Sequence, residues 1–156
     1  MSYCFCGEYQ HSVDVKGRMI IPQKFREILG TNFVVTRGLD GCLSVYPMEA
    51  WEVFTQKLKS LPISNSNARQ FVRYFMAGAA ECELDKQGRI LIPQSLRQDV
   101  GITKEVVVTG AGERVEIWAV DKWEKYNSTL TSDEIALNME SLGRFLTFAT
   151  FNILTF

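Results

Sequence analysis

The chain of 156 residues contains one 13-residue segment twice. Residues 14–26 read DVKGRMIIPQKFR and residues 85–97 read DKQGRILIPQSLR, so Asp, Gly, Arg, Ile, Pro, Gln and Arg recur at a constant offset of 71. The correspondence continues to Gly30 and Gly101 and then gains one residue, so that Trp51 aligns with Trp123. A tandem duplication usually packs as a pseudo-symmetric pair. We therefore expect two copies of one small unit, with any chemistry of the repeated residues present in duplicate.

Each copy is expected to form a strand, a turn, a second strand, a short helix, two further strands and a helix. Pro22 is expected to open the first helix, because its missing N–H is not needed there, and Gly30 to end it as a left-handed cap. Pro93 and Gly101 repeat this arrangement. The expected strands cover residues 5–13, 19–21, 33–36, 43–46, 106–109 and 115–118. Two further helices are expected from Pro47 to Leu58 and over residues 67–77.

Four short strands in one copy are too few to close a barrel. Two copies that exchange strands across a pseudo-two-fold axis would close one. The sequence therefore predicts a mixed α/β (α+β) fold, in which a swapped-hairpin β-barrel is built from two tandem repeats and flanked by helices. The expected divisions are a first repeat at 7–52, linking helices at 53–77, a second repeat at 78–124, and a C-terminal helix at 129–148 with Ser132 as its N-cap.

Composition limits the classes of function. The net charge of -1 and the isoelectric point near 5.9 argue against a surface that is basic all over, so a nucleic-acid contact must come from a local patch. No run of about 18 apolar residues predicts a membrane span. Without an apparent export signal, the four cysteines are expected to be reduced thiols in a cytoplasm.

The repeated turn, Asp-x-x-Gly-Arg, carries the candidate chemistry. Aspartate can accept backbone N–H groups within such a turn, and glycine can take the positive φ that the turn needs. Arginine then presents a planar fork suited to phosphate or to guanine. The same pattern also suits a purely structural Asp–Arg ion pair, and the four residues alone do not separate the two readings. The candidate DNA-binding residues are Asp14, Lys16, Gly17, Arg18, Asp85, Lys86, Gly88 and Arg89.

Three segments resemble the MraZ family: residues 7–26 (GEYQHSVDVKGRMIIPQKFR), 36–47 (TRGLDGCLSVYP) and 83–93 (ELDKQGRILIP). The resemblance covers about residues 5–145. It implies a bacterial transcriptional regulator of the division and cell wall gene cluster, built from two AbrB-type swapped-hairpin modules. It further implies a nucleoid-associated ring of subunits that binds direct repeats upstream of its own operon through Asp-x-x-x-Arg. In this sequence that motif is Asp14 to Arg18 and Asp85 to Arg89. The apolar end, residues 149–156, departs from the polar tail expected of the family.

Other functions have weaker support in the sequence. An AbrB-type protein-interaction module would act through a C-terminal arm, here residues 129–156, that folds on a partner. Cys4, Cys6 and His11 could supply three metal ligands, but Cys-x-Cys is not the usual zinc spacing, and we expect no metal and no other cofactor. No pair of titratable groups has catalytic spacing, so we expect neither an enzyme nor a small-molecule substrate. The first repeat is the more basic, which favours its loop as the leading contact.

Overall fold

The computed structural model describes residues 4–143. The chain divides into two compact units, Met1–Val120 and Asp121–Phe156, which are described separately. The first repeat contributes β1 (Glu8–Ser12), β2 (Arg18–Ile20), α1 (Gln23–Leu29), β3 (Asn32–Arg37), β4 (Leu43–Pro47), α2 (Met48–Lys59) and α3 (Ser66–Gly78). The second contributes β5 (Ala80–Glu83), β6 (Arg89–Leu91), α4 (Gln94–Asp99), β7 (Glu105–Gly110), β8 (Val115–Ala119), α5 (Val120–Ser128) and α6 (Ser132–Gly143).

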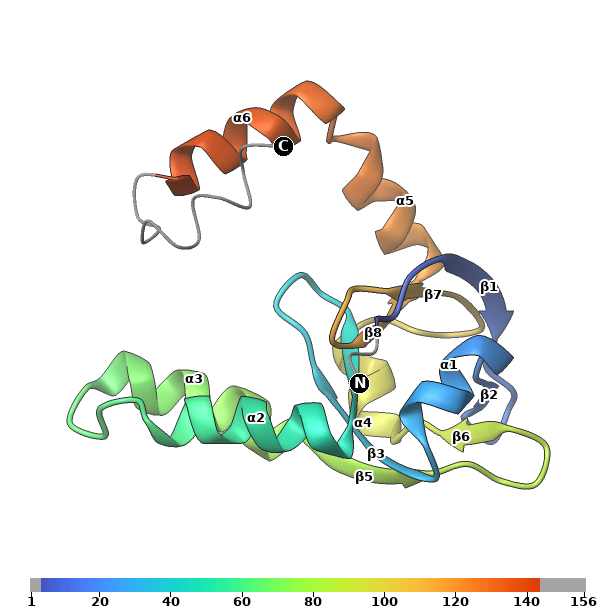
Figure 1. Cartoon of the computed structure of the whole chain (residues 1–156). Coiled ribbons are helices and arrows are strands. Elements are labelled where there is room, and N and C mark those ends of the chain that lie inside the picture. Colours follow the sequence, from blue (N-terminus) through green and yellow to red (C-terminus); the bar gives the residue numbers. More distant parts are fainter. Residues whose placement is uncertain (1–3, 144–156) are drawn as a thin grey trace. The chain divides into compact units, whose positions relative to one another are not determined.

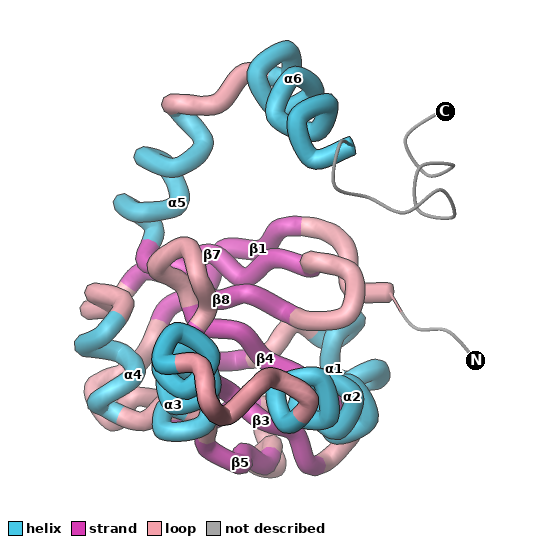
Figure 2. The backbone as a smooth tube through the Cα atoms, turned by 90° about the vertical axis from the view of Figure 1, so that its left-hand side faces the viewer, coloured by secondary structure: helices cyan, strands magenta, loops and turns pink. Residues whose placement is uncertain are grey.

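The strands form two antiparallel sheets in which the repeats exchange strands (Figure 1), and Figure 2 shows the strands of the larger sheet. The larger sheet has the order β1-β7-β8-β4-β3-β5, and β2 pairs only with β6. Strand β1 of the first repeat thus pairs with β7 of the second, while β5 of the second repeat pairs with β3 of the first. This exchange confirms the predicted swapped-hairpin architecture, because neither repeat completes its sheet alone.

The two repeats meet along a pseudo-two-fold axis. In the small sheet, Met19 pairs with Ile90, its own counterpart at the offset of 71. In the large sheet, β4 and β8 also pair antiparallel, with Ser44 opposite Glu116. We call the two-stranded sheet β2–β6 the ribbon. Its inner residues, Met19 and Ile90, are each only 1% exposed and join one apolar core shared by both repeats.

The core extends from the ribbon into the short helices that follow it. Ile21 and Ile92 are fully buried directly after β2 and β6, and Phe25 on α1 and Leu96 on α4 pack into the same cluster. Burying one such side chain contributes roughly 1.5–3 kcal/mol relative to leaving it exposed. Both ends of the ribbon are therefore anchored by apolar packing. This packing also holds in place the strands β2 and β6, which the two turns precede.

Three local expectations are corrected. The strand expected over 5–13 is shorter, because Gly7 adopts φ 100° and leaves Phe5 in an isolated bridge with Gly112. Pro22 lies just before α1 and is not its first helical residue: its ψ of 136° is extended. Gly30 has the expected positive φ of 74°, but its ψ of -160° is outside the left-handed helical region.

Helices α2 and α3 lie side by side as a hairpin (Figure 1), and aromatic rings pack between them. The ring of Phe54 on α2 stacks on Tyr46 at 5.3 Å and meets Phe75 of α3 edge-on at 5.1 Å. The side chain of Asn65 caps α3 by accepting the N–H groups of Asn67 and Ala68. Both predicted helices are present: α3 extends one residue further at each end than expected, and α2 begins at Met48, after Pro47, whose ψ of 152° is extended.

The second unit contains α5 from Asp121 onward and α6. Thr131, and not the predicted Ser132, is the N-cap of α6: its Oγ1 accepts the N–H of Glu134, whose carboxylate accepts the N–H of Thr131. This reciprocal pair is a capping box, which satisfies two backbone donors at once. The expected helical stretch beyond residue 143 and the apolar end at 149–156 lie outside the described residues.

Candidate nucleic-acid interface

The turn before β2 is held by one carboxylate. Oδ1 of Asp14 accepts the backbone N–H groups of Lys16 and Arg18, both at 2.9 Å, and Oδ2 accepts the Nε–H of Arg18 at 2.8 Å. The N–H of Gly17 closes the turn onto the carbonyl of Asp14 at 2.9 Å. The aspartate therefore fixes both the backbone of the turn and the direction of the arginine that follows it.

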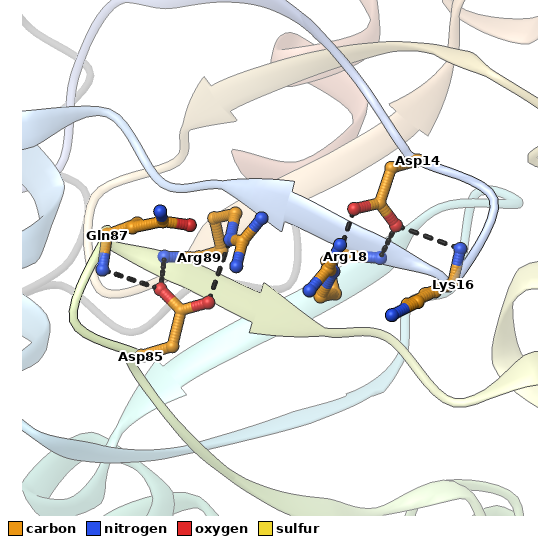
Figure 3. A network of polar contacts seen from close by, with 6 residues as sticks. All are labelled: Asp14, Lys16, Arg18, Asp85, Gln87 and Arg89. Carbon is orange, nitrogen blue, oxygen red and sulfur yellow. Dashed lines mark hydrogen bonds and ion pairs between the residues drawn. The ribbon is translucent and has the colours of Figure 1, made fainter.

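The turn before β6 repeats these contacts. Oδ1 of Asp85 accepts the N–H groups of Gln87 and Arg89 at 2.9 Å, and Oδ2 accepts the Nε–H of Arg89 at 2.8 Å. Figure 3 shows the two networks at opposite ends of the ribbon, each formed by a turn and the first residue of the strand that follows it. One chain thus presents two pre-set Asp–Arg pairs on a single piece of sheet.

The structural ion pair considered as an alternative is present in both copies. The arginines remain partly exposed, with side-chain exposures of 32% for Arg18 and 25% for Arg89. Among the described residues, Nε is the one guanidinium atom of each that takes part in these bonds, so the Nη groups keep their donors for another acceptor. An exposed pair of this kind adds little stability. Its larger effect is to hold the guanidinium in one orientation before any ligand arrives.

The turn aspartates are stabilised as carboxylates. The backbone N–H of Arg18 is the largest influence that lowers the pKa of Asp14, and its guanidinium lowers it further. The backbone N–H of Arg89 acts in the same way on the pKa of Asp85. Both carboxyl groups therefore stay charged throughout the neutral range, so both loops keep their geometry there.

Two features favour glycine in each turn. Gly17 has φ 86° and Gly88 has φ 76°, which L side chains rarely adopt. In addition, a Cβ at Gly17 would lie 2.8 Å from Cζ of Arg97, and a Cβ at Gly88 would lie 2.7 Å from Cζ of Arg26. These arginines belong in each case to the other repeat.

The outer face of the ribbon combines cationic and apolar side chains. Residues two apart on a strand share a face, and the register places Arg18 opposite Leu91 and Ile20 opposite Arg89. Ile20 is 44% exposed and Leu91 is 58% exposed. A two-stranded antiparallel ribbon fits the major groove of B-DNA, where guanidinium groups bind guanine and aliphatic groups contact the thymine methyl.

The structure brings the predicted site residues together around this ribbon. Arg18 and Arg89 lie on its outer face, Lys16 and Lys86 are exposed in the turns, and Gly17 and Gly88 are buried. Residues 14–26 hold four basic residues and one acidic residue, and residues 85–97 hold three and one. The ribbon and its flanks therefore carry a net charge of +5 in a chain whose net charge is -1, which makes this region the expected local basic patch.

Four residues around the ribbon were not among the predicted site residues: Ile20, Leu91, Arg26 and Arg97. Arg26 and Arg97 recur in the duplicated segment, so the repeat itself could have singled them out. Their position against the glycine of the other repeat depends on the tertiary structure. Ile20 and Leu91 have no distinguishing signal in the sequence, because exposed and buried aliphatic residues alternate along such short strands.

The metal site considered for Cys4, Cys6 and His11 is not formed among the described residues. Among residues 4–143, no three His, Cys, Asp or Glu side chains are grouped so that they could hold a metal ion. Cys4 and Cys6 are exposed, and His11 lies half-buried on β1 opposite Val106, where burial lowers its pKa. Within the same residues, no helix is long and apolar enough to cross a membrane.

Comparison with known proteins identifies the family. The family model described as "MraZ protein, putative antitoxin-like" matches twice, over residues 4–74 and 75–143. The chain belongs to the MraZ family. The two matched MraZ segments each contain one Asp-x-x-Gly-Arg turn, in agreement with the duplication.

Curated MraZ relatives match over nearly their full length. A protein of Alkaliphilus metalliredigens is 55% identical over 141 residues, which is 89% of this chain and 99% of the relative. One of Pelotomaculum thermopropionicum is 58% identical, covering 89% of this chain and 97% of the relative, and one of Clostridium acetobutylicum is 54% identical, covering 89% and 99%. Each is named "Transcriptional regulator MraZ" and none is named as an enzyme.

A likeness to a solved structure is weaker. The solution structure of PHS018 from Pyrococcus horikoshii is 17% identical, with 72% of this chain and 87% of that chain covered, and its TM-score is 0.31. This overlap is too small to support an argument.

Proposed function

We propose that this chain is a transcriptional regulator that binds double-stranded DNA with the outer face of the ribbon. The observation that carries the proposal is the pair of Asp–Arg turns at the two ends of β2–β6, each with a partly exposed guanidinium fixed by an aspartate. The printed names of the MraZ relatives support the same function. Arg18 and Arg89 make base or phosphate contacts, and Lys16 and Lys86 neutralise phosphates beside them.

The finer proposal follows the family resemblance. The chain represses the division and cell wall gene cluster of its bacterium by binding direct repeats upstream of its own operon, in the cytoplasm and on the nucleoid. Because one ribbon reaches few base pairs, several chains in a ring bind linked sites at high effective concentration. The exposed apolar residues of the α2–α3 hairpin, such as Ile63 and Met76, support self-association.

The test is fluorescence anisotropy with the duplex immediately upstream of the gene and a shuffled duplex, over a salt series. Sequence-dependent binding that weakens with salt is expected, and each lost phosphate contact should reduce the slope of log K against log salt by about 0.9. Lys57→Ala serves as a charge-matched control for the loss of Lys16 or Lys86, because Lys57 is an exposed lysine on α2, outside the ribbon and its turns. Equal binding of both duplexes would contradict a sequence-specific regulator.

A second candidate function is a protein-interaction module that acts through residues 129–156. Exposed apolar side chains on α6, namely Ile135, Leu137, Met139 and Leu142, favour it. Removal of residues from 129 onward distinguishes the two functions. The regulator keeps specific contacts with a single operator repeat through the ribbon, whereas the interaction module loses its partner.

A further inference from the structure

Each repeat sends an arginine onto the turn of the other repeat. Arg26 is on α1 of the first repeat, yet its guanidinium lies against Gly88, where an added Cβ would meet Cζ at 2.7 Å and Nη1 closer still. Arg97 on α4 lies in the same way against Gly17, with Cζ and Nη2 both 2.8 Å from the Cβ position. The absence of a side chain at these glycines is what gives the guanidiniums room.

The main chain connects the same groups. The N–H of Ile21 donates to the carbonyl of Gly88 at 3.0 Å, and the carbonyl of Ile21 accepts Nε–H of Arg26 at 2.9 Å. One residue, Ile21, therefore bonds both to the opposite turn and to the arginine that covers it.

The other end of the ribbon has the equivalent pair of hydrogen bonds. The N–H of Ile92 donates to the carbonyl of Gly17 at 2.9 Å, and the carbonyl of Ile92 accepts Nε–H of Arg97 at 3.0 Å. Since both Ile21 and Ile92 are fully buried, the arginines are tied to rigid points of the core.

We propose that Arg26 and Arg97 are positioning residues, each of which holds the DNA-binding turn of the other repeat. Arg97 fixes the turn that presents Arg18, and Arg26 fixes the turn that presents Arg89. This rests on the proposed function and deepens it: the two turns form one unit, because each depends on a helix of the opposite repeat. A pre-set pair of turns loses less conformational entropy on binding DNA than two independent loops would.

The first test needs no DNA. The N–H of Gly17 donates to Asp14 and that of Gly88 donates to Asp85, so amide hydrogen exchange at these glycines reports the closure of each turn. Arg97→Gln should speed exchange at Gly17 several-fold and leave Gly88 unchanged, and Arg26→Gln should do the reverse. Exchange that rises at the turn of the same repeat, at both turns or at neither turn overturns the proposal.

A second pair of variants covers the possibility that Arg97→Gln does not fold. Gly17→Ala adds a Cβ at positive φ and displaces Arg97, whereas Gly30→Ala adds a Cβ at the positive φ of 74° with nothing within 4 Å. Only Gly17→Ala should open the first turn and free the Arg97 side chain, as seen in its Nε–H resonance. Opening of the first turn by Gly17→Ala with an unchanged Arg97 Nε–H resonance would show that backbone strain acts without Arg97, and would contradict the role of Arg97.

The DNA measurement is a double-mutant cycle on operator affinity. Arg97→Gln should weaken specific binding about tenfold in the wild-type background, add little to Arg18→Ala, and add its full effect to Arg89→Ala. A positioning role leaves the salt slope unchanged, whereas a direct phosphate contact by Arg97 would reduce it and overturn the proposal. Absence of specific binding by the wild type would refute the proposed function, while the crossed exchange pattern would still decide the positioning role.

Discussion

Met19 pairs with Ile90, the residue that repeats it 71 positions later, at the centre of the ribbon. This pairing places the pseudo-two-fold axis between the Asp–Arg turns, so Arg18 and Arg89 occupy equivalent positions on one face. The two turns differ in their neighbours: Lys16 in the first corresponds to Gln87 in the second. The equivalence makes the two arginines matched probes of the same surface.

Arg18→Ala should cost about 1–3 kcal/mol of specific DNA-binding free energy, which is roughly a five- to hundredfold loss of affinity. Arg89→Ala should cost less, because its turn has Gln87 in place of Lys16. Anisotropy with the upstream duplex measures both, and circular dichroism and sedimentation should show unchanged folding and oligomer size. A parallel loss of folding in Arg18→Ala would support the purely structural ion pair.

Acid should destabilise the two turns, because protonation of Asp14 and Asp85 removes the charge of the carboxylates that hold them. The pKa values of Asp14 and Asp85 lie below the ordinary 3.8, chiefly because backbone N–H groups bond to the carboxylates. A carboxyl whose pKa is lower when folded stabilises the folded state above its unfolded pKa, and this contribution is lost as the pH falls through the folded value.

The measurement is the melting temperature of the wild type and of Asp14→Asn between about pH 7 and about pH 3. The stability advantage of the wild type should be constant in the neutral range and shrink below about pH 4. An advantage that grows on acidification would show that the ionised carboxylate does not hold the turn.

Gly110→Ala should destabilise the fold by about 3 kcal/mol, because a Cβ there would collide with the backbone of Phe5 and Cys6. The N-terminal segment would have to move, and Phe5, only 1% exposed, would leave the core. Thermal or denaturant unfolding measures the loss. Gly112→Ala is the control, since nothing lies within 4 Å of its Cβ position and only its φ of 78° is strained. A smaller loss for Gly110→Ala than for this control would refute the steric argument.

Ile63→Asp should reduce self-association. Ile63 is 84% exposed and lines a groove of about 310 Å³ on the α2–α3 hairpin together with Leu58 and Val72. A charge there would be desolvated in any interface that covers the groove. Light scattering at fixed concentration reports the mass, and Ser64→Asp adds the same charge one residue away. An unchanged mass for Ile63→Asp would exclude this groove from the subunit contact.

The four cysteines should divide into two reactivity classes. Burial raises the pKa of Cys42 to about 12 and that of Cys82 to about 11, so both thiols stay protonated and shielded at neutral pH. Cys4 and Cys6 are exposed and should react quickly with a thiol reagent. We expect two thiols per chain to react quickly in the folded protein and all four to react in denaturant. A third fast equivalent without denaturant would show that one of the buried thiols opens to solvent.

The sequence by itself determined the repeat, the order of the elements and the two Asp-x-x-Gly-Arg turns. These follow from local chemistry, since turn glycines, prolines that directly precede a helix and apolar strands act within a few residues. The same locality explains the small errors. The ψ of Gly30 and the choice of Thr131 over Ser132 as the N-cap depend on which of several neighbouring residues makes the hydrogen bond at the helix end.

Only the tertiary structure decided how the two turns are joined. The pairing of Met19 with Ile90 and the contacts of Arg26 with Gly88 and Arg97 with Gly17 connect residues about 60 to 80 positions apart. Such contacts depend on strand exchange across the whole barrel, and no local pattern encodes the partner of a side chain at that separation. The duplicated sequence therefore predicted two copies of a site, and the exchange of strands makes each copy depend on the other.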